Sequence, residues 1–399
     1  MRIDHVEQAY ATIDPPEHPR RLRAWLLSAL GVAIVFALLG AGLWSYDMWE
    51  HHWRDISITV DGTAKTVPAD TTLGGLIRDN DGFGRKPGAL LSLTGKVLER
   101  HGGMAITASV DSVRVPQLRF NETTLSDGAN VVLTQGADVT EDHIVQHTAI
   151  AFNVEMDGHG VIQMVKQQGR DGVREVWVGK DSHDRIDKGV IEEPTDLIIR
   201  SISPKPTGRK VIALTFDDGP SQYSGPVLDI LKAHGVKATF FDIGKDAVQY
   251  PQMEQRMVAE GQEVASHSNT HPNMTAISSE AMRQDITQGL SSLEQASGTK
   301  TKVFRAPYGA FTAQQWRHAS DLIDCNVIWS IDTEDWKRPG ADRIRDTVLN
   351  NAYNGAVVIM HDGGGNRSQD VQALPGIIDG LKAQGYEFVT IQQLIDMSK

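Results

Sequence analysis

The sequence is almost devoid of cysteine: Cys325 is the only one among 399 residues. An intramolecular disulfide is therefore impossible, and so is a zinc or iron–sulfur site built from several thiolates. Basic residues are also in the minority, with 39 Lys and Arg against 51 Asp and Glu and a formal net charge of −12. Because phosphate binding requires a basic face, this balance argues against nucleic acid as a partner. Cys325 begins an apolar run, so we expect a small buried residue there.

The composition also lacks the biases of disordered or collagen-like chains. Hydrophobic residues make up 40% of the sequence, and Gly and Pro contribute 37 and 16 residues. At roughly 100–200 residues per domain, the length has room for two or three domains.

Charged residues are missing from one apolar run, residues 24–46. As a helix rising about 1.5 Å per residue it would span about 34 Å, enough to cross a hydrocarbon core of roughly 30 Å. An arginine-rich segment, residues 20–23, precedes it, so the positive-inside rule puts residues 1–23 in the cytoplasm. A cleaved signal peptide is the alternative, but the run is long for a signal and no small-x-small cleavage site follows it. We therefore expect a single-pass transmembrane helix at 24–46, with the rest of the chain extracytoplasmic.

A first small β-rich module is expected over residues 55–140. Apolar residues alternate with polar ones over 56–60, and Asp61-Gly62 is a strong hairpin signal. A short helical stretch over 71–77 follows. Further strands are expected at 104–110, 113–120 and 130–135. This order resembles the β-grasp modules of bacterial wall-associated proteins.

A second β-rich module is expected over residues 141–203. Glycines recur at positions 169, 172, 179 and 189 among strand-like runs such as Glu175–Val178 and Leu197–Arg200. The spacing is similar to that of five-glycine wall modules, which implies binding to polymers that contain N-acetylglucosamine. The other interpretation is a plain spacer, which we favour because Trp177 alone does not make an aromatic platform. The Pro-rich segment 203–208 then indicates a short, stiff linker.

Strands and helices alternate after residue 208. This alternation predicts an α/β fold with about seven parallel strands, in a sheet or a barrel. The strand candidates are 211–216, 238–243, 263–267, 303–307, 326–331, 356–361 and 387–390, and helix candidates between them include 224–234, 278–297 and 369–384. In such folds the reactive residues sit at the C-terminal ends of the strands.

Reactive residues follow five of these strands. The first ends in Asp217-Asp218, where one carboxylate can bind a metal while the other stays free as a base. The third ends in His267 and His271, which are four residues apart and can face the same way on a helical turn. Imidazole suits zinc and similar metals. Two His and one Asp would give three ligands and leave a position open for water, which is typical of catalytic metal sites.

The other three strand ends are Arg305–Gly309, Asp332–Trp336 and His361-Asp362. A cation beside an aromatic ring could orient a carboxylate or a substrate, and acids beside an indole suit a sugar-binding rim. Each segment alone also fits an ordinary turn, a solvated loop or a core histidine. Five of them at one edge of a sheet favour a functional site.

The segments TFDDGP, HSNTH, RAPYG, DTEDW and IMHD, in this order, resemble the five motifs of the polysaccharide deacetylase family over residues 208–399. The resemblance implies a distorted (β/α) barrel and the removal of acetyl groups from N-acetylated sugars in chitin or peptidoglycan, or from acetylated xylan. Two departures are visible. Ala306 stands where the family often has Pro, and Ile359 stands where it usually has Leu.

The resemblance also implies a role for each motif residue. The general base would be Asp217, the metal ligands Asp218, His267 and His271, the general acid His361, the orienting residues Arg305 and Asp335, and the substrate contacts Pro307, Tyr308 and Trp336. The backbone N–H of Tyr308 would help stabilise the oxyanion. Ile359 lies two residues before His361 on the same strand face. It would either line a pocket for the acetyl methyl group or be a plain core residue.

The sequence therefore predicts a membrane-anchored, metal-dependent hydrolase that removes acetyl groups from peptidoglycan N-acetylglucosamine. Zinc is the expected metal, with cobalt and iron as alternatives. The other hypotheses are a non-catalytic wall-binding scaffold, or a deacetylase that acts on chitin oligomers or acetylated xylan. No ligand or base of the motifs is missing, which favours the enzyme. N-acetylmuramic acid stays open as the target sugar.

Overall fold

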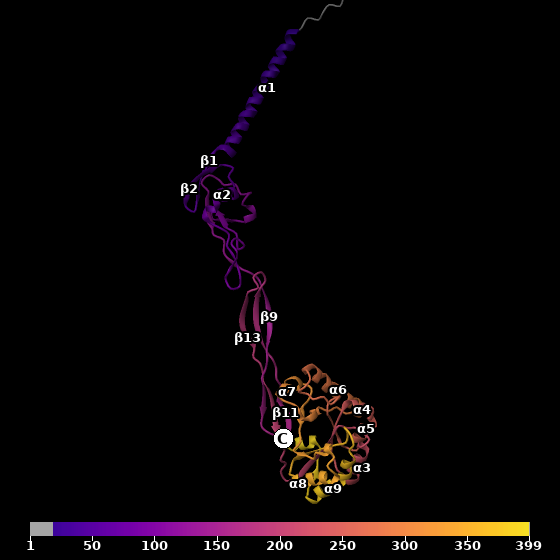
Figure 1. Cartoon of the computed structure of the whole chain (residues 1–399). Helices are drawn as coiled ribbons and strands as arrows, with labels where there is room; N and C mark the ends of the chain where they lie inside the picture. Colours follow the sequence, from indigo (N-terminus) through magenta and orange to yellow (C-terminus); the bar gives the residue numbers. More distant parts are fainter. Residues whose placement is uncertain (1–18, 399) are drawn as a thin grey trace, which may run out of the picture. The chain divides into compact units, whose positions relative to one another are not determined.

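The computed structural model describes residues 19–398 of the chain (Figure 1). Most of the expected cytoplasmic tail, residues 1–18, therefore lies outside the described residues. The chain forms two compact units. Among the described residues, the smaller unit comprises 19–146 and 176–187, and the larger unit comprises 147–175 and 188–398.

An apolar helix, α1 (Pro19–Met48), contains the run expected to cross a membrane, and a π-helical turn, η1 (Trp49–Trp53), continues it. The stretch Leu30–Trp53 is 24 residues long and none of it is buried. Its large side chains lie open, as Phe36 and Leu43 show with exposed fractions of 70% each. A helix of this kind is compatible with a membrane anchor or with a signal sequence.

The smaller unit contains a five-stranded sheet in the order β2-β1-β7-β5-β6, in which β1 and β7 are parallel. The expected hairpin is confirmed, because β1 and β2 pair antiparallel around Asp61 and Gly62, whose φ angles are +50° and +82°. Its elements are β1 Asp55–Val60, β2 Thr63–Pro68, α2 Leu73–Asp79, η2 Asp81–Gly84, β3 Leu90–Leu91, β4 Val97–Glu99, β5 Thr107–Val110, β6 Val113–Val115, η3 Gln117–Arg119, β7 Asn130–Thr134 and β8 Val139–Thr140. Alternating residues of β1 pack with α2 to form the core.

Two further sheets are small. Strands β3, β4 and β8 form one in the order β4-β3-β8. Strands β9 His143–Ile150, β12 Gly172–Gly179 and β13 Arg185–Glu192 form the other, in the order β13-β12-β9. Most side chains of β9 and β13 are exposed.

The larger unit is built on an eleven-stranded sheet in the order β10-β14-β11-β19-β18-β17-β16-β15-β21-β20, with β22 also paired to β15. The strands are β10 Val154–Asp157, β11 Ile162–Gln167, β14 Leu197–Ile202, β15 Val211–Asp217, β16 Thr239–Asp242, β17 Glu263–Ser266, β18 Val303–Phe304, β19 Cys325–Val327, β20 Ile331–Asp332, β21 Ala356–His361 and β22 Glu387–Phe388. The strands from β15 to β22 pair only in parallel with one another. The α/β expectation is therefore confirmed, while closure of the barrel stays a prediction because this hydrogen-bonded path is open.

Several expected strands were wrong in extent: the segment 113–120 is a strand only over β6 before the 3-10 turn η3, and 303–307 is a strand only over β18. The run 326–331 is not continuous: β19 ends at Val327, and β20 begins at Ile331. The reason is that β19 pairs with β18 whereas β20 pairs with β21. The chain therefore leaves the sheet after β19 and returns to it as β20, beyond β21 at the end of the strand order. Trp329 lies on this crossing.

The strands β10, β14 and β11 come from the segment expected to form a separate module at 141–203. They extend the same sheet, because β11 pairs antiparallel with β14 and with β19. The hydrogen-bonded sheet thus runs across the expected linker at 203–208. The division into modules and a catalytic domain at these residues stays a prediction.

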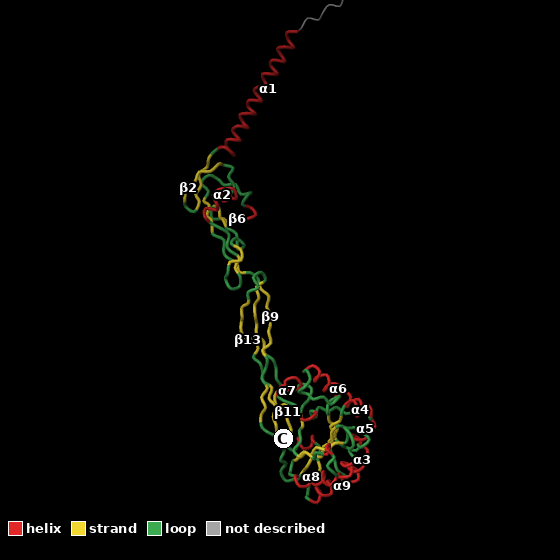
Figure 2. Tube along the Cα trace, viewed as in Figure 1, coloured by secondary structure: helices red, strands yellow, loops and turns green. Residues whose placement is uncertain are grey.

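Helices surround the strands of the larger unit, as Figures 1 and 2 show. The three helices expected from the sequence are confirmed as α3, α6 and α9. The helices are α3 Ser224–His234, α4 Gly244–Gln249, α5 Pro251–Ala259, α6 Ser279–Ser297, α7 Ala313–Ala319, α8 Ala341–Asn351, α9 Ser368–Ala383 and α10 Ile391–Asp396, with 3-10 turns η4 Pro307–Gly309 and η5 Asp335–Lys337. Strand β15 is buried at all seven positions, which makes it the centre of this unit's core.

Candidate active site

The five motif segments follow the C-terminal ends of strands that lie in one sheet. Asp217 is the last residue of β15 and His361 is the last residue of β21, and the two are paired in register. His267 and Arg305 come directly after β17 and β18. Because these strands are parallel, their carboxyl ends lie at one edge and carry the side chains together.

Asp217 and Arg305 form a buried ion pair at this edge. Arg305 Nη1 donates to Asp217 Oδ1 at 2.5 Å, and the two side chains are 0% and 2% exposed. The guanidinium also donates to Thr215 Oγ1 and to the Val327 carbonyl, and it stacks on the Phe241 ring at 4.0 Å. Burial lowers the pKa of Arg305, while the charge of Asp217 opposes that shift. The pair fixes the Asp217 carboxylate in one orientation.

Asp218, His267 and His271 could hold a metal ion, since their ligand atoms lie within 4.8 Å of one another. The Asp218 Oδ1 atom is 3.6 Å from His267 Nε2 and 3.2 Å from His271 Nε2. Two ligands about 2.1 Å from a tetrahedral zinc ion would be about 3.4 Å apart, so the observed spacing fits.

The chemistry of the three donors fits a cation as well. His267 Nδ1 donates to the Arg305 carbonyl at 2.8 Å, which leaves the Nε2 lone pair facing Asp218. Burial lowers the pKa of His267 and so favours its neutral form. Burial opposes ionisation of Asp218, but a hydrogen bond from His271 and the nearby His267 and His361 hold its pKa well below the usual range. Asp218 Oδ1 is buried, and His271 Nε2 lies 3.2 Å from it.

His361 and Asp335 form a second functional pair. His361 Nδ1 lies 2.8 Å from Asp335 Oδ1, and the His361 backbone N–H donates to Asp335 Oδ2 at 2.8 Å. Burial alone would raise the pKa of Asp335, but the hydrogen bond from His361 lowers it to about 2. Burial alone would lower the pKa of His361, but the hydrogen bond and charge of Asp335 raise it above its usual value. The pair therefore stabilises an imidazolium whose Nε2–H is available as an acid.

A pocket of about 580 Å³ brings most of the expected residues together. It is lined by Asp217, Asp218, His267, His271, Tyr308, Trp329, Asp332, Trp336, Ile359, His361, Gly364 and Arg367. Tyr308 and Trp336 are 66% and 56% exposed at its rim, whereas Ile359 is buried. Arg305 and Asp335 stand behind Asp217 and His361 rather than on the surface. Pro307 is buried at the start of η4 and is not among the lining residues.

Sequence reasoning missed Trp329, Gly364 and Arg367 among the lining residues. Trp329 looked like one more apolar position of a strand, and only the break between β19 and β20 turns it toward the pocket. Arg367 comes six residues after His361, and its guanidinium donates to the carbonyls of Gly363 and Gly364. A Gly-rich run that follows a motif histidine was the available signal.

Three buried carboxyl groups lie behind the pocket. Asp242, Glu254 and Asp362 are each 0% exposed. In the described structure no donor reaches either oxygen of Asp242 or of Glu254. Burial raises the pKa of Glu254 to about 8 and that of Asp362 to about 7, and burial with the charge of Glu254 raises that of Asp242. Burial therefore shifts all three groups toward their protonated forms.

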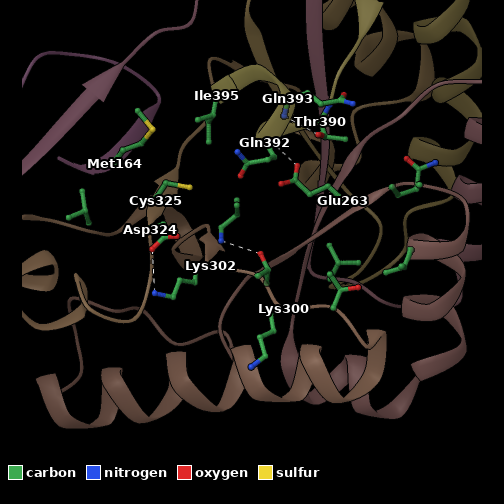
Figure 3. A pocket seen from close by; sticks show the side chains of 18 residues that line it. Met164, Glu263, Lys300, Lys302, Asp324, Cys325, Thr390, Gln392, Gln393 and Ile395 are labelled. Atoms are coloured by element: carbon green, nitrogen blue, oxygen red, sulfur yellow. Dashed lines mark hydrogen bonds and ion pairs between the residues drawn. The ribbon is translucent and has the colours of Figure 1, made fainter. Parts of the chain in front are cut away.

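A second hollow, of about 650 Å³, lies at the opposite ends of the strands (Figure 3). Its walls include the first residues of β17, β18 and β19, and its charged groups have partners. Lys302 pairs with Asp324 at 3.5 Å, and Glu263 accepts from the Gln392 backbone N–H. Cys325 lines it but is only 3% exposed, as expected from the sequence, and burial raises its pKa to about 12. None of the expected site residues lines this hollow.

The model of the polysaccharide deacetylase family matches residues 204–322. A peptidoglycan-N-acetylglucosamine deacetylase of Bacillus cereus is 37% identical over 196 residues, which cover 49% of this chain and 71% of that protein. A chitooligosaccharide deacetylase of Bradyrhizobium sp. is 36% identical over 201 residues, covering 47% of this chain and 92% of that protein. The chain therefore belongs to the polysaccharide deacetylase family.

Another relative is the peptidoglycan-N-acetylglucosamine deacetylase of Listeria monocytogenes. It is 42% identical over 193 residues, which cover 48% of this chain. The match spans only 40% of the length of that protein.

Proposed function

We propose that this protein hydrolyses the N-acetyl group of N-acetylglucosamine in peptidoglycan and leaves a free amine and acetate. The observation that carries the proposal is the convergence of three devices in one pocket: an oriented carboxylate, a possible metal triad and a histidine–aspartate pair. A relative named for peptidoglycan-N-acetylglucosamine is among the most similar proteins, which favours this glycan over chitin oligomers and xylan.

Asp217 acts as the general base. Its Oδ1 is occupied by Arg305, so Oδ2 is the atom that accepts the proton of the attacking water. The guanidinium pairs with the carboxylate in a buried position, where an unpaired charge would be costly. The water's oxygen then forms a bond to the acetamide carbon.

His361 acts as the general acid. Its Nδ1–H is held by Asp335, so the opposite ring nitrogen donates a proton to the amine as the C–N bond breaks. The backbone N–H of Tyr308 stabilises the oxyanion. Trp336 and Tyr308 line the sugar-binding rim, and Ile359 receives the acetyl methyl group.

Asp218, His267 and His271 would hold a divalent ion, with zinc first and cobalt or iron as alternatives. When bound, such an ion supplies Lewis acidity, which favours ionisation of water and polarises a carbonyl. His267 serves as a neutral ligand because its Nδ1–H is already donated to the Arg305 carbonyl.

The detergent-solubilised full chain should release acetate from N-acetylglucosamine oligomers and from purified peptidoglycan. A chelator should abolish the release and added zinc should restore it. Asp217→Asn should lower kcat by roughly 10²-fold or more, because the base is lost. Asp229→Asn, which changes an exposed carboxylate on α3, is the matched control and should keep full activity.

Chelator-insensitive release, or full activity of Asp217→Asn, would contradict the proposed mechanism. Binding to insoluble peptidoglycan without acetate release would favour the scaffold hypothesis. Faster release from chitin oligomers or acetylated xylan would move the substrate assignment to those glycans. Mass spectrometry of muropeptides then identifies which sugar loses its acetyl group.

The apolar helix α1 supports a further part of the proposal, that residues 24–46 anchor the enzyme with residues 1–23 in the cytoplasm. The full chain should stay in the membrane pellet after an alkaline carbonate wash, whereas a chain that lacks residues 1–50 should be soluble. Recovery of a shortened chain in the soluble fraction would instead indicate a cleaved signal sequence.

A further inference from the structure

A third carboxyl group stands behind the His361–Asp335 pair. Asp370 lies in the first turn of α9 and is 1% exposed. Its carboxyl group is close enough to that of Asp335 that Asp335 raises the pKa of Asp370 and Asp370 lowers that of Asp335. Within the described residues, Asp370 Oδ1 meets no N–H or hydroxyl donor.

Both oxygens of Asp335 already accept hydrogen bonds. Oδ1 accepts from His361 Nδ1 and from the Trp336 backbone N–H, and Oδ2 accepts from the His361 backbone N–H. Asp335 is therefore the ionised member of the two carboxyl groups. A second buried carboxylate against it would add an unpaired like charge in a poorly solvated place.

The charged groups that face Asp370 do not compensate the repulsion between two ionised carboxylates. Asp335, on η5, is an acceptor, and His361, on β21, donates to Asp335 rather than to Asp370. Arg367, at the start of α9, is close enough to lower the pKa of Asp370, but two of its nitrogens donate to the carbonyls of Gly363 and Gly364. A shared proton is the arrangement that satisfies both carboxyl groups.

We propose that Asp370 is protonated at neutral pH and donates its O–H to Asp335, which makes it a positioning residue for the general acid His361. The donor fixes the rotation of the Asp335 carboxylate and withdraws charge from it. His361 thereby keeps its Nδ1–H and directs the opposite nitrogen into the pocket. This inference rests on the proposed function only in giving His361 the role of acid.

Ionisation of Asp370 supplies a signature that a purely structural residue would lack. Burial and the contact with Asp335 raise the pKa of Asp370 to about 9. Above that pH the donor is lost and a second negative charge faces the pair. The titration curve of His361 should therefore show a second inflection near pH 9.

The test compares Asp370→Asn, which keeps a donor but cannot ionise, with Asp370→Leu, which removes the donor at similar volume. Acetate release by the full chain is measured against pH, and His361 is titrated by NMR of histidine-labelled protein, with its signal assigned through His361→Gln. The leucine variant should lose about tenfold or more in kcat, because a hydrogen bond to a charged group is lost. The asparagine variant should recover most of that loss.

The inflection near pH 9 should be present in the wild type and absent from Asp370→Asn. The inference is overturned if Asp370→Asn keeps the inflection, or if it loses as much activity as Asp370→Leu. The NMR titration needs no turnover, so it tests the coupling of Asp370 to His361 even if no acetate is released. If the leucine variant does not fold, the comparison of wild type with Asp370→Asn decides alone.

Discussion

Arg305→Met should abolish acetate release at neutral pH and destabilise the larger unit by about 3–5 kcal/mol. The guanidinium is fully buried and holds Asp217, Thr215 and a strand carbonyl at once. Without it the buried Asp217 carboxylate loses its ion-pair partner and is no longer held in the orientation that a base requires. Methionine fills much of the volume, which confines the change to charge and hydrogen bonds.

The measurements are acetate release and the free energy of unfolding of the full chain. Arg283→Met is the matched control, because Arg283 also makes a two-pronged contact with an aspartate, Asp321, but at the surface. An exposed pair of this kind contributes about 1 kcal/mol or less, so the control should keep its activity and nearly all its stability. Equal losses in the two variants would show that burial of the Arg305–Asp217 pair is not what matters.

Glu254→Gln should stabilise the larger unit by several kcal/mol at pH 9 and by little at pH 4.5. The pKa of Glu254 is raised from 4.5 to about 8 by burial. A carboxyl group whose pKa is higher in the folded state contributes its stability below the unfolded pKa and loses it as pH rises through the folded pKa. The loss therefore develops between about pH 4.5 and 8. Glutamine avoids it because it does not ionise.

Unfolding is followed by urea titration at both pH values. Glu260→Gln is the matched control, since Glu260 pairs with Arg256 and its pKa is lowered rather than raised. The control should gain nothing at pH 9. A stabilisation by Glu254→Gln that is equal at both pH values would point to packing instead of ionisation.

The sequence was most informative where a reactive residue ends an apolar strand. Asp217, His267 and His361 each follow a run of buried residues, and parallel strands bring their ends to one edge. The local sequence around each strand end was therefore sufficient to predict these catalytic and metal-binding candidates. The last residues of β18 and β19 were harder to predict from the sequence. These strands are short, and tertiary contacts determine where the chain leaves the sheet.

Contacts between elements that are distant in the sequence could not be predicted. Glu254 is one acid on a short amphipathic helix, and its pattern fits a solvated face. Only the packing of α5 places it against Asp242 at the end of β16. Asp370 likewise reads as an ordinary acid in the first turn of a helix, where the helix dipole favours it. The spacing of residues in the sequence indicates neither the burial of these two acids nor the sharing of a proton.

The antiparallel strand β11 limits how far the enzyme can be shortened from its N-terminal side. Gln163 Oε1 accepts from the Trp316 indole and from the Asn326 amide, both inside the larger unit. A fragment that begins at residue 208 would strip β11 from β19, leave those two donors without an acceptor and open a sheet edge to other chains. The shortest fragment that keeps every strand of this sheet begins ahead of β10, although the motifs start some sixty residues later.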